Sequence, residues 1–362
     1  MHVGLSLTFQ NYAGARPDHE IWADEVRLSE RAIALGFDGI WATEHHFSDY
    51  EITPDPLQFL SYIAGRDSAV KLGTMAVILP WHDPVRVAEQ ISVLDTLSGG
   101  RLILALGRGL GRSEFEGLRV PMEESRERFI ESAQIVLEAL ETGVLRGEGP
   151  HYPIPERRLR PTPSRSFRGR TYAAALSPES YEIMARLGVG MLIIAVKGWE
   201  IVGADMGRYR EAYRVLNGAE PPPPLANAFV VCDSDPGRAR ELASRHMGNY
   251  YRAVVEHYGF TRESFAGTKG YEHYANISAE MAKEGPDRVV EDFIDVQVWG
   301  TPAQCMEKIV WLRELVGSET FLPVFGYGGM PYADVERGME LFAREVMPGL
   351  QALPALAPAA AR

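Results

Sequence analysis

Apolar and polar positions along the chain follow two alternating patterns. Short, almost wholly apolar runs recur, and between them lie longer stretches whose apolar residues repeat at helical spacing. The short runs predict eight strands, at residues 3–9, 39–42, 71–79, 102–106, 170–176, 189–196, 225–232 and 320–325. The longer stretches predict helices at residues 18–35, 56–66, 84–97, 123–141, 178–187, 199–216 and 332–347.

Helix starts carry a recurring sequence signal. A side chain that can cap a helix stands directly before a proline at Asp55-Pro56, Asp83-Pro84, Ser177-Pro178, Asp235-Pro236 and Thr301-Pro302. The cap oxygen accepts hydrogen bonds from free backbone N–H groups, and proline at the first helical position has no N–H to leave unpaired. Each pair therefore predicts the first turn of a helix.

Apolar strands that alternate with helices predict an α/β fold, a closed eight-fold parallel β/α (TIM) barrel, because strands this apolar are covered on both faces. An open doubly wound sheet is the alternative. It is disfavoured because no glycine-rich dinucleotide turn follows the first strand, where Phe9-Gln10-Asn11-Tyr12 stands. We expect one barrel domain over residues 1–350 and a flexible Ala/Pro-rich tail at 351–362.

One stretch interrupts the alternation after the seventh strand. Residues from about 235 to 300 exceed a normal crossover between strands, so we expect an insertion there. Its composition predicts helices and a mobile segment near 259–285, which is a candidate lid over the strand ends.

Composition narrows the class of protein. The 362-residue chain has a net charge of -12 and no basic tract, which argues against nucleic acid as a partner. Cys232 and Cys305 lie far apart and match no metal-binding spacing, so we expect buried free thiols and no bound metal. Neither a signal-peptide pattern nor a membrane-spanning run is found, so we expect a cytoplasmic protein with no membrane partner.

The most distinctive chemistry follows the second strand, at Glu44-His45-His46-Phe47. Imidazole is the side chain most easily poised for proton transfer near neutral pH, and strand C-terminal ends are where such barrels place their chemistry. Adjacent histidines on an extended segment point to opposite sides, so we expect the two to have different roles. A structural histidine is the ordinary alternative for each of them.

Three features point to an anion. Gly107-Arg108-Gly109 follows the fourth strand, Arg126 stands at the start of the next helix, and Ser177 and Ser180 flank a helix N-terminus. Glycines let a backbone approach a ligand closely, and a helix N-terminus offers free N–H donors. Each feature alone fits a tight turn, a solvated arginine or a plain cap, whereas together they favour a phosphorylated cofactor.

Several motifs, in this order, resemble the bacterial-luciferase-like flavin-dependent monooxygenases and oxidoreductases. They are Glu44-His45-His46-Phe47, Leu72-Gly73-Thr74 to Leu79-Pro80, His82-Asp83-Pro84-Val85-Arg86-Val87-Ala88-Glu89, Leu94-Asp95 to Gly99-Gly100-Arg101, Gly107-Arg108-Gly109 and Glu345-Val346-Met347-Pro348. The resemblance implies a β/α barrel with reduced FMN at the strand C-terminal ends. It also implies a catalytic His45 for proton transfer and a cis peptide between Met75 and Ala76. The cofactor-binding residues would be Glu44, Met75, Ala76, Gly107, Arg108, Arg126, Leu176, Ser177 and Ser180.

The resemblance further implies a homodimer packed through the helices at 56–66 and 84–97, with His46 and Glu89 at the subunit interface. One departure stands at Gly107, where light-emitting members carry a cysteine, and this argues against light emission. The implied activity is that of a two-component monooxygenase. A separate flavin reductase, or free reduced flavin, would supply reduced FMN, and dioxygen would form a flavin peroxide or hydroperoxide that oxygenates an organic substrate.

We expect a small, largely apolar substrate, such as an aldehyde or ketone, between the flavin, the lid and the rings of Phe9, Trp41 and Phe47. Baeyer–Villiger insertion and hydroxylation both fit this expectation.

Three other functions remain open at this point. A reduced deazaflavin would transfer hydride on the same barrel. A metal-dependent hydrolase would use His45, His46, His82 and Asp83, although adjacent histidines point apart. A flavin-binding protein without turnover would need neither His45 nor a lid.

Overall fold

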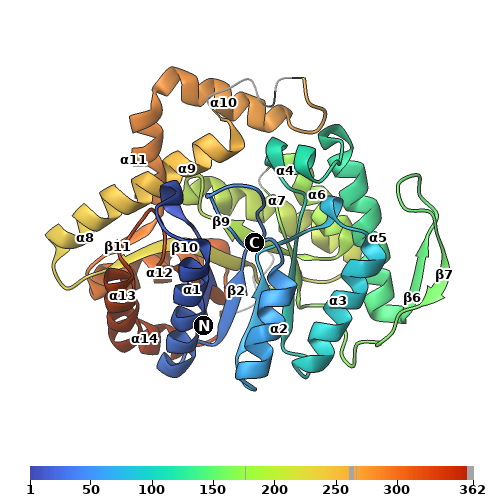
Figure 1. Cartoon of the computed structure of the whole chain (residues 1–362), viewed down its shortest axis with the longest axis horizontal. Helices are drawn as coiled ribbons and strands as arrows, with labels where there is room; N and C mark the ends of the chain where they lie inside the picture. Colours follow the sequence, from blue (N-terminus) through green and yellow to red (C-terminus); the bar gives the residue numbers. More distant parts are fainter. Residues whose placement is uncertain (176, 261–264, 266, 357–362) are drawn as a thin grey trace.

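Strands pair in parallel around a closed ring in the computed structural model, which describes residues 1–175, 177–260, 265 and 267–356 (Figure 1). Strand β1 pairs with β2 on one side and with β12 on the other, and β9 pairs with β10, which closes the ring. Among the described residues the ring consists of β1 (His2–Leu7), β2 (Gly39–Ala42), β3 (Lys71–Thr74), β5 (Leu102–Gly107), β8 (Thr171–Ala174), β9 (Gly190–Ile194), β10 (Leu225–Cys232) and β12 (Thr320–Val324).

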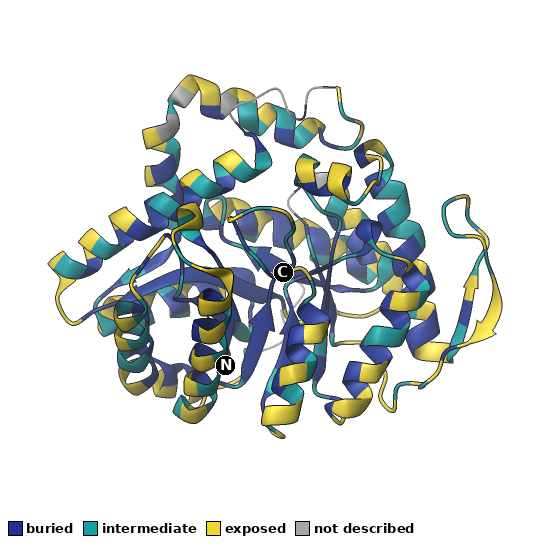
Figure 2. Ribbon diagram, in the orientation of Figure 1, coloured by how far each residue is buried: buried dark blue, intermediate teal, exposed yellow. Residues whose placement is uncertain are grey.

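The ring confirms the predicted eight-fold barrel, and the open doubly wound sheet is wrong. Every predicted strand forms, because each run is apolar enough to be covered by helices outside and side chains inside (Figure 2). The third run divides into β3 and the short β4 (Val77–Ile78), which flank a cis peptide bond between Met75 and Ala76. The cis bond confirms what the family resemblance implied.

Helices cover the outside of the ring. A helix begins at each of the five predicted cap-proline pairs, although the Ser177 side chain makes no capping hydrogen bond. Asp55 accepts a hydrogen bond from the Gln58 N–H, Asp83 and Asp235 cap in the same way, and Thr301 forms a capping box. The helices are α1 (Asp18–Leu35), α2 (Pro56–Arg66), α3 (Pro84–Leu97), α4 (Arg112–Gly117), α5 (Ser125–Thr142), α6 (Pro178–Leu187), α7 (Trp199–Asn217), α12 (Pro302–Val316), α13 (Tyr332–Glu345) and α14 (Met347–Gln351).

Two excursions leave the ring. The segment between α5 and β8, where we predicted no strand, forms an antiparallel hairpin of β6 (Val144–Gly147) and β7 (Ile154–Arg158) at one side of the barrel (Figure 1). The insertion contains α8 (Pro236–Leu242), a π-helical turn (Ala243–Met247), α9 (Gly248–Tyr258), α10 (Glu272–Glu284), α11 (Pro286–Val296) and β11 (Val298–Gly300). The expectation of helices in the insertion is confirmed, and Figure 1 places α10 at one extreme of the molecule, beyond α9 and α4.

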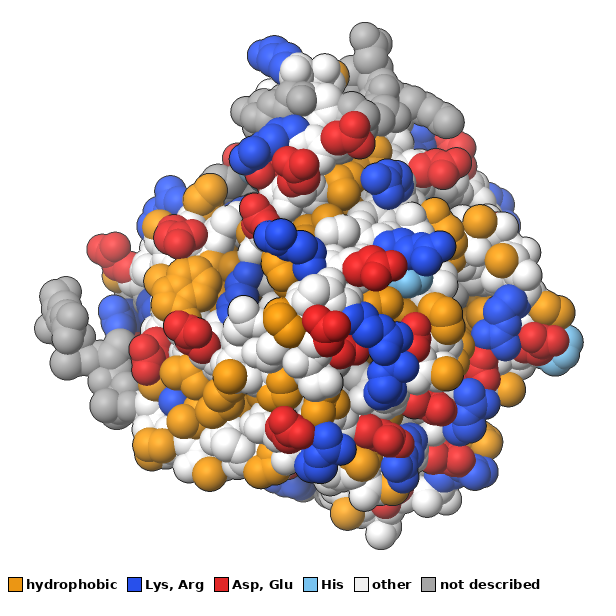
Figure 3. Space-filling view, turned by 90° about the vertical axis from the view of Figure 1, so that its left-hand side faces the viewer, with side chains coloured by type: hydrophobic (Ala, Val, Ile, Leu, Met, Phe, Trp, Pro, Cys, Tyr) orange, Lys and Arg blue, Asp and Glu red, His pale blue; other side chains and the backbone are white. Residues whose placement is uncertain are grey.

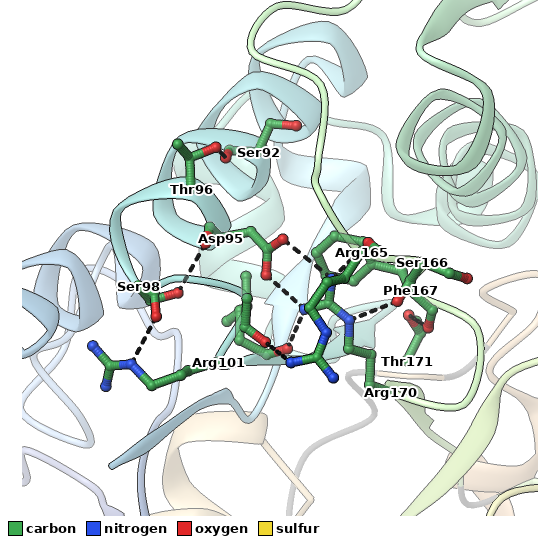
Figure 4. A network of polar contacts seen from close by, with 12 residues as sticks. Ser92, Asp95, Thr96, Ser98, Arg101, Arg165, Ser166, Phe167, Arg170 and Thr171 are labelled. Carbon is green, nitrogen blue, oxygen red and sulfur yellow. Dashed lines mark hydrogen bonds and ion pairs between the residues drawn. The ribbon is translucent and has the colours of Figure 1, made fainter. Parts of the chain in front are cut away.

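A buried ion pair connects elements at the end of the barrel where the strands begin (Figure 4). Asp95 on α3 is wholly buried, and its two oxygens accept from Arg170 Nη1 at 2.6 Å and Nη2 at 3.1 Å. Arg170 also donates to the Leu102 carbonyl at 2.8 Å. Bidentate charge-assisted pairs of this kind are stronger and more directional than neutral hydrogen bonds. The pair therefore joins α3 to the starts of β5 and β8.

The charged surface and the two cysteines are as the sequence predicted. Basic and acidic side chains are interspersed over the face shown in Figure 3. Cys232 and Cys305 are buried free thiols, as predicted. Within the described part of the chain, every helix is too short or too polar to traverse a bilayer.

Candidate active site

Two cavities meet at the C-terminal ends of the strands. Each encloses about 960 Å³ of space, part of it open to solvent, which is at the upper end of the range for ligand sites. We call them the arginine cavity, lined by Arg108 and Arg126, and the tyrosine cavity, lined by Tyr50 and Tyr250. They share His45, Met75, Leu110, Ile194, Tyr258 and Tyr274, so His45 stands at the junction.

The arginine cavity contains most of the residues predicted to hold a cofactor. Its lining includes Glu44, Met75, Ala76, Gly107, Arg108, Arg126 and Ser180. The Ser177 hydroxyl lies 2.8 Å from that of Ser180. Leu176, predicted to belong to the same set, lies outside the described residues.

Two guanidinium groups converge on a single acceptor in the arginine cavity. Arg108 Nη1 donates to the Gly270 carbonyl oxygen at 2.8 Å, and Arg126 Nη2 donates to the same oxygen at 3.2 Å. The neighbouring Tyr271 ring lies under the Arg108 guanidinium at 4.1 Å, and its hydroxyl donates to the Gly109 carbonyl. Two cations that share one oxygen form a seat suited to an anionic group such as a phosphate.

Glu44 connects the end of β2 to β4 and to the two histidines His46 and His82. This buried carboxylate accepts from the Ile78 N–H at 2.9 Å and lies 2.6 Å from His82 Nε2 and 3.2 Å from His46 Nε2. Burial alone would raise the pKa of Glu44, but the hydrogen bonds from His46 and His82 outweigh it and lower that pKa. His46 is therefore held on the side of α3.

His45 turns the opposite way, as expected for adjacent residues of an extended segment. Its Nδ1 lies 3.0 Å from Glu114 Oε1, which also accepts from the His46 backbone N–H at 2.9 Å. Glu114 is wholly buried, and its other oxygen lies 3.4 Å from His257 Nε2. On the far side of His257, Nδ1 lies 3.0 Å from the Ser48 hydroxyl. One carboxylate thus faces two imidazoles.

The charges around Glu114 set different states for these imidazoles. Burial disfavours the imidazolium of His45, but the carboxylates of Glu114 and Glu51 outweigh burial and raise the pKa of His45 to about 9. Burial, opposed by the hydrogen bond to Glu114, lowers the pKa of His257, and the charge on His45 adds to that effect. Burial also opposes ionisation of Glu114, yet His45 and His257 lower its pKa well below the usual range. At neutral pH His45 is an imidazolium and His257 is neutral.

The same three groups are the set, among the described residues, that offers metal ligands. Ligand atoms of His45, Glu114 and His257 lie within 4.8 Å of one another. The set predicted for a metal hydrolase is not brought together, because His46 and His82 converge on Glu44 while Asp83 caps α3. A proton on His45 accounts for the 3.0 Å contact with Glu114 without an ion.

The tyrosine cavity is walled by rings from the insertion. Phe229 comes from β10 and Tyr50 from the loop between β2 and α2, and the remaining rings come from α9, α10, α11 and the loop after α9. Burial raises the pKa of Tyr50, Tyr250 and Tyr258 well above the ordinary value, so these phenols are neutral. The aromatic lining consists of Tyr50, Phe229, Tyr250, Tyr251, Tyr258, Phe260, Tyr274 and Phe293.

The rings predicted to surround the substrate lie elsewhere. Phe9 packs against Trp22 and Phe59, with centroids 4.6 and 4.9 Å away. Trp41 fills the barrel interior, where a Cβ on Gly73 would stand 1.9 Å from its Nε1. Phe47 is 66% exposed. The structure includes none of the three among the residues that line either cavity.

Sequence analysis missed three titratable residues of the site. Glu51 follows the histidine pair within one loop, Glu114 lies in the short helix after the glycine-arginine turn, and His257 lies in the last turn of α9 in the insertion. Of the three, Glu114 alone could have been suspected from the sequence, because it closely follows the recognised motif Gly107-Arg108-Gly109. Nothing in the local pattern around His257 separates it from an ordinary helix residue.

Comparison with known proteins gives one consistent family. The family model described as luciferase-like monooxygenase matches residues 1–319. An alkanal monooxygenase alpha chain of Photobacterium leiognathi is 27% identical over 355 residues, which is 96% of this chain and 98% of that protein.

Two solved structures share the fold. The oxygenating constituent of 3,6-diketocamphane monooxygenase from Pseudomonas putida, a type II Baeyer–Villiger monooxygenase in complex with FMN, superposes with a TM-score of 0.74 at 19% identity. That match covers 99% of this chain and 100% of the other. The coenzyme F420-dependent tetrahydromethanopterin reductase of Methanopyrus kandleri superposes with a TM-score of 0.67 at 20% identity, over 96% and 99% of the two chains.

Replacing Glu114 by glutamine removes the charge that keeps His45 protonated. We expect the pKa of His45 to fall by about 1–3 units in Glu114→Gln. In the wild type the stabilising effect of His45 is fully present below its unfolded pKa of about 6.5 and is lost as pH rises through about 9. That dependence should flatten in the variant. Histidine NMR titration and urea unfolding between pH 6 and 10 measure both effects.

Glu116→Gln is the matched control, because Glu116 lies on the exposed face of the same helix. It should leave the His45 titration unchanged. An unaltered His45 pKa in Glu114→Gln would contradict the assigned coupling.

Proposed function

The chain belongs to the luciferase-like monooxygenase family. We propose that it uses reduced FMN and dioxygen to oxygenate a small, largely apolar organic compound. FMN would occupy the arginine cavity and the substrate the tyrosine cavity. The observation that carries the proposal is the junction of the two cavities at His45. Bound reduced flavin supplies the activation of dioxygen. The protein supplies binding, orientation and a proton.

The residues of the arginine cavity fit a flavin phosphate and ring. Arg108 and Arg126 already direct two guanidinium groups at one oxygen, and that oxygen belongs to a backbone carbonyl where a phosphate oxygen would be a stronger acceptor. Ser177 and Ser180 add hydroxyls near the start of α6. Met75 and Ala76 supply an apolar wall, and Gly107 keeps the wall clear, since a Cβ there would stand 2.5 Å from Ile78 Cδ1.

His45 has the protonation state and the position for the proton-transfer role. Glu114 holds Nδ1, which leaves Nε2 on the side of the junction between the cavities. An imidazolium at that point donates a proton to a developing negative charge and recovers it later. Residues 267–271 contact Arg108, Arg112 and Arg126, so we propose that residues 267–285 of the predicted lid cover the site and limit entry of water. Residues 261–264 and 266 of that predicted lid lie outside the described residues.

A deazaflavin is the second candidate cofactor. The structural likeness to an F420-dependent reductase favours keeping it, because both cofactors present a tricyclic ring and a phosphate. Hydride transfer without dioxygen would then replace oxygenation. The arginine cavity suits either cofactor, so the two are separated by reaction with oxygen.

Loss of either phosphate-binding arginine should weaken FMN but spare riboflavin, which has the same ring and no phosphate. We expect Arg108→Ala and Arg126→Ala each to raise the Kd for FMN by about 10- to 100-fold, the effect of removing a charge-assisted hydrogen bond. Flavin fluorescence titration measures both ligands. Arg128→Ala is the control, since Arg128 on the same helix pairs with Glu124 instead.

A selective loss of riboflavin affinity in the two variants would contradict the phosphate assignment. So would an unchanged Kd for FMN in both of them.

Oxygen from labelled dioxygen should appear in product. Protein with reduced FMN, ¹⁸O₂ and a panel of apolar ketones and aldehydes is expected to give singly labelled products by mass spectrometry.

His45→Asn should bind FMN as before and form product about 100-fold more slowly, because general acid–base catalysis supplies about that factor. His19→Asn, at an exposed histidine, is the control.

The source of reduced flavin and the cofactor are tested in the same assay. We propose that a separate reductase supplies the flavin, so NADH alone should give no product until a flavin reductase is added. Reduced products without label from a deazaflavin, with none from FMN, would establish the second candidate instead.

We also propose a homodimer through α2 and α3. Glu89, Val93 and Leu97 share one face of α3, because residues four apart stand above one another on a helix, and Leu97 is 65% exposed. His46 lies nearby, between Glu44 and Trp81, and would support that interface.

We expect sedimentation velocity to give a dimer for the wild type and a monomer for Leu97→Glu. Val215→Glu, at an 80% exposed position on α7, should remain dimeric. A monomeric wild type would refute the proposal.

A further inference from the structure

Glu51 is the carboxyl group that lines the tyrosine cavity. It lies in the loop between β2 and α2 and is 1% exposed. The other polar groups of that lining are hydroxyls, the Asn227 amide and His45. A buried carboxyl group in a cavity lined mainly by aromatic and aliphatic side chains is an exception to the rule that such groups are exposed or paired, and it calls for a partner.

One oxygen of Glu51 is bound and the other is free. Oε1 accepts a hydrogen bond from the Tyr250 hydroxyl at 3.1 Å, and that hydroxyl lies 2.7 Å from the hydroxyl of Tyr50. Oε2 has no hydrogen-bond partner among the described residues. His45 Nε2 is 3.8 Å from it, beyond hydrogen-bond distance. Because buried polar atoms are almost always paired, the free oxygen points to a ligand that supplies the missing contact.

The surroundings of Glu51 determine whether that oxygen donates or accepts. Burial raises the pKa of Glu51 to about 7, against the opposing charge of His45. The uncharged side chains of Thr43 and Tyr250 also oppose the rise in the pKa of Glu51, whereas the carboxyls of Glu114 and Glu25 act against its ionisation. At pH 6, below that pKa, the carboxyl group is mostly protonated and can donate one hydrogen bond from Oε2 into the tyrosine cavity.

The remaining walls limit the shape of the ligand. Tyr251 and Phe293 stack at 4.4 Å with an angle of 16° between their planes. Phe229 packs edge-on against Tyr327 and lies 4.2 Å from the Tyr250 ring. Fixed aromatic faces around a cavity favour flat ring systems, which pack against such faces over a large area.

We propose that Glu51 determines substrate specificity by donating a hydrogen bond to a carbonyl oxygen, so that the tyrosine cavity selects flat, ring-containing ketones over the matching hydrocarbons. The proposal rests on the function proposed above, in that the tyrosine cavity is taken as the substrate cavity. The carbonyl oxygen accepts from Glu51 Oε2, and the ring system lies among the aromatic walls. The same contact brings the carbonyl group to the His45 junction, beside the arginine cavity.

The test compares two probes that differ at one oxygen. The full-length protein saturated with oxidised FMN is titrated with 1-tetralone and with tetralin by calorimetry between pH 6 and 8. We expect 1-tetralone to bind about 5- to 10-fold more tightly at pH 6 than at pH 8, the effect of one neutral hydrogen bond. Tetralin should bind equally at both pH values. His45 is an imidazolium throughout this range, so its own titration does not contribute.

Two variants at Glu51 separate the hydrogen bond from the shape of the cavity. Glu51→Gln keeps an N–H donor and should retain the preference for the ketone while losing its pH dependence. Glu51→Leu has no donor and should lose both, while tetralin binding shows that the cavity is intact. Glu256→Gln, at an exposed carboxylate near the end of α9, is the control and should behave as the wild type.

The proposal is overturned if FMN-saturated wild type binds the two probes equally at every pH or binds neither. It is also overturned if Glu51→Leu keeps the pH-dependent preference. Failure of the proposed monooxygenase function appears separately, because these titrations need neither reduced flavin nor dioxygen. A protein with the ketone preference but no labelled product would retain the Glu51 assignment and lose the oxygenase.

Discussion

Closure of a parallel ring is the constraint on which the rest of the structure depends. Because every strand of the ring runs in the same direction, the chain segments that follow β2, β3, β5 and β8 all emerge at one rim. His45 and Glu114 are 69 positions apart in sequence, yet they touch at that rim. The buried pair of Asp95 and Arg170 joins α3 to β5 and β8 at the opposite end of the barrel, away from this rim.

At the rim, two adjacent histidines each contact a different buried carboxylate. Glu44 holds His46 beside His82, and Glu114 holds His45 beside His257. Each carboxylate is wholly or almost wholly buried, so it is stable as an anion only because cationic or hydrogen-bonding groups surround it. The result is an imidazolium at the junction of two cavities, where we propose that proton transfer takes place.

The insertion after β10 completes both cavities. Its rings form most of the wall of the tyrosine cavity, and the Gly270 carbonyl occupies the point where Arg108 and Arg126 converge. A cofactor phosphate at that point would compete with the carbonyl for the same donors. Binding of a cofactor and the placement of residues 267–271 are therefore coupled through two arginines in this proposal.

The sequence by itself determined the barrel, the capped helix starts, the free thiols and the opposite directions of His45 and His46, because these depend on local periodicity, cap chemistry and the two-residue repeat of extended chain. It also predicted one anion site with Arg108, from the glycine-arginine turn, and Arg126, from its place at the start of the next helix, and both residues line the arginine cavity. The domain limits at 1–350 and the tail, of which residues 357–362 lie outside the described part, stay predictions.

Only the tertiary structure decided which rings and acids meet. Trp41 turns into the barrel because Gly4, Gly39 and Gly73 leave room for its indole, which no local pattern around Trp41 reveals. Glu51, Glu114 and His257 come from a loop, a short helix and the insertion, and they share one cluster because strand closure brings those segments together. Local periodicity specifies which face of an element is buried, whereas the partner across the rim depends on contacts between distant segments.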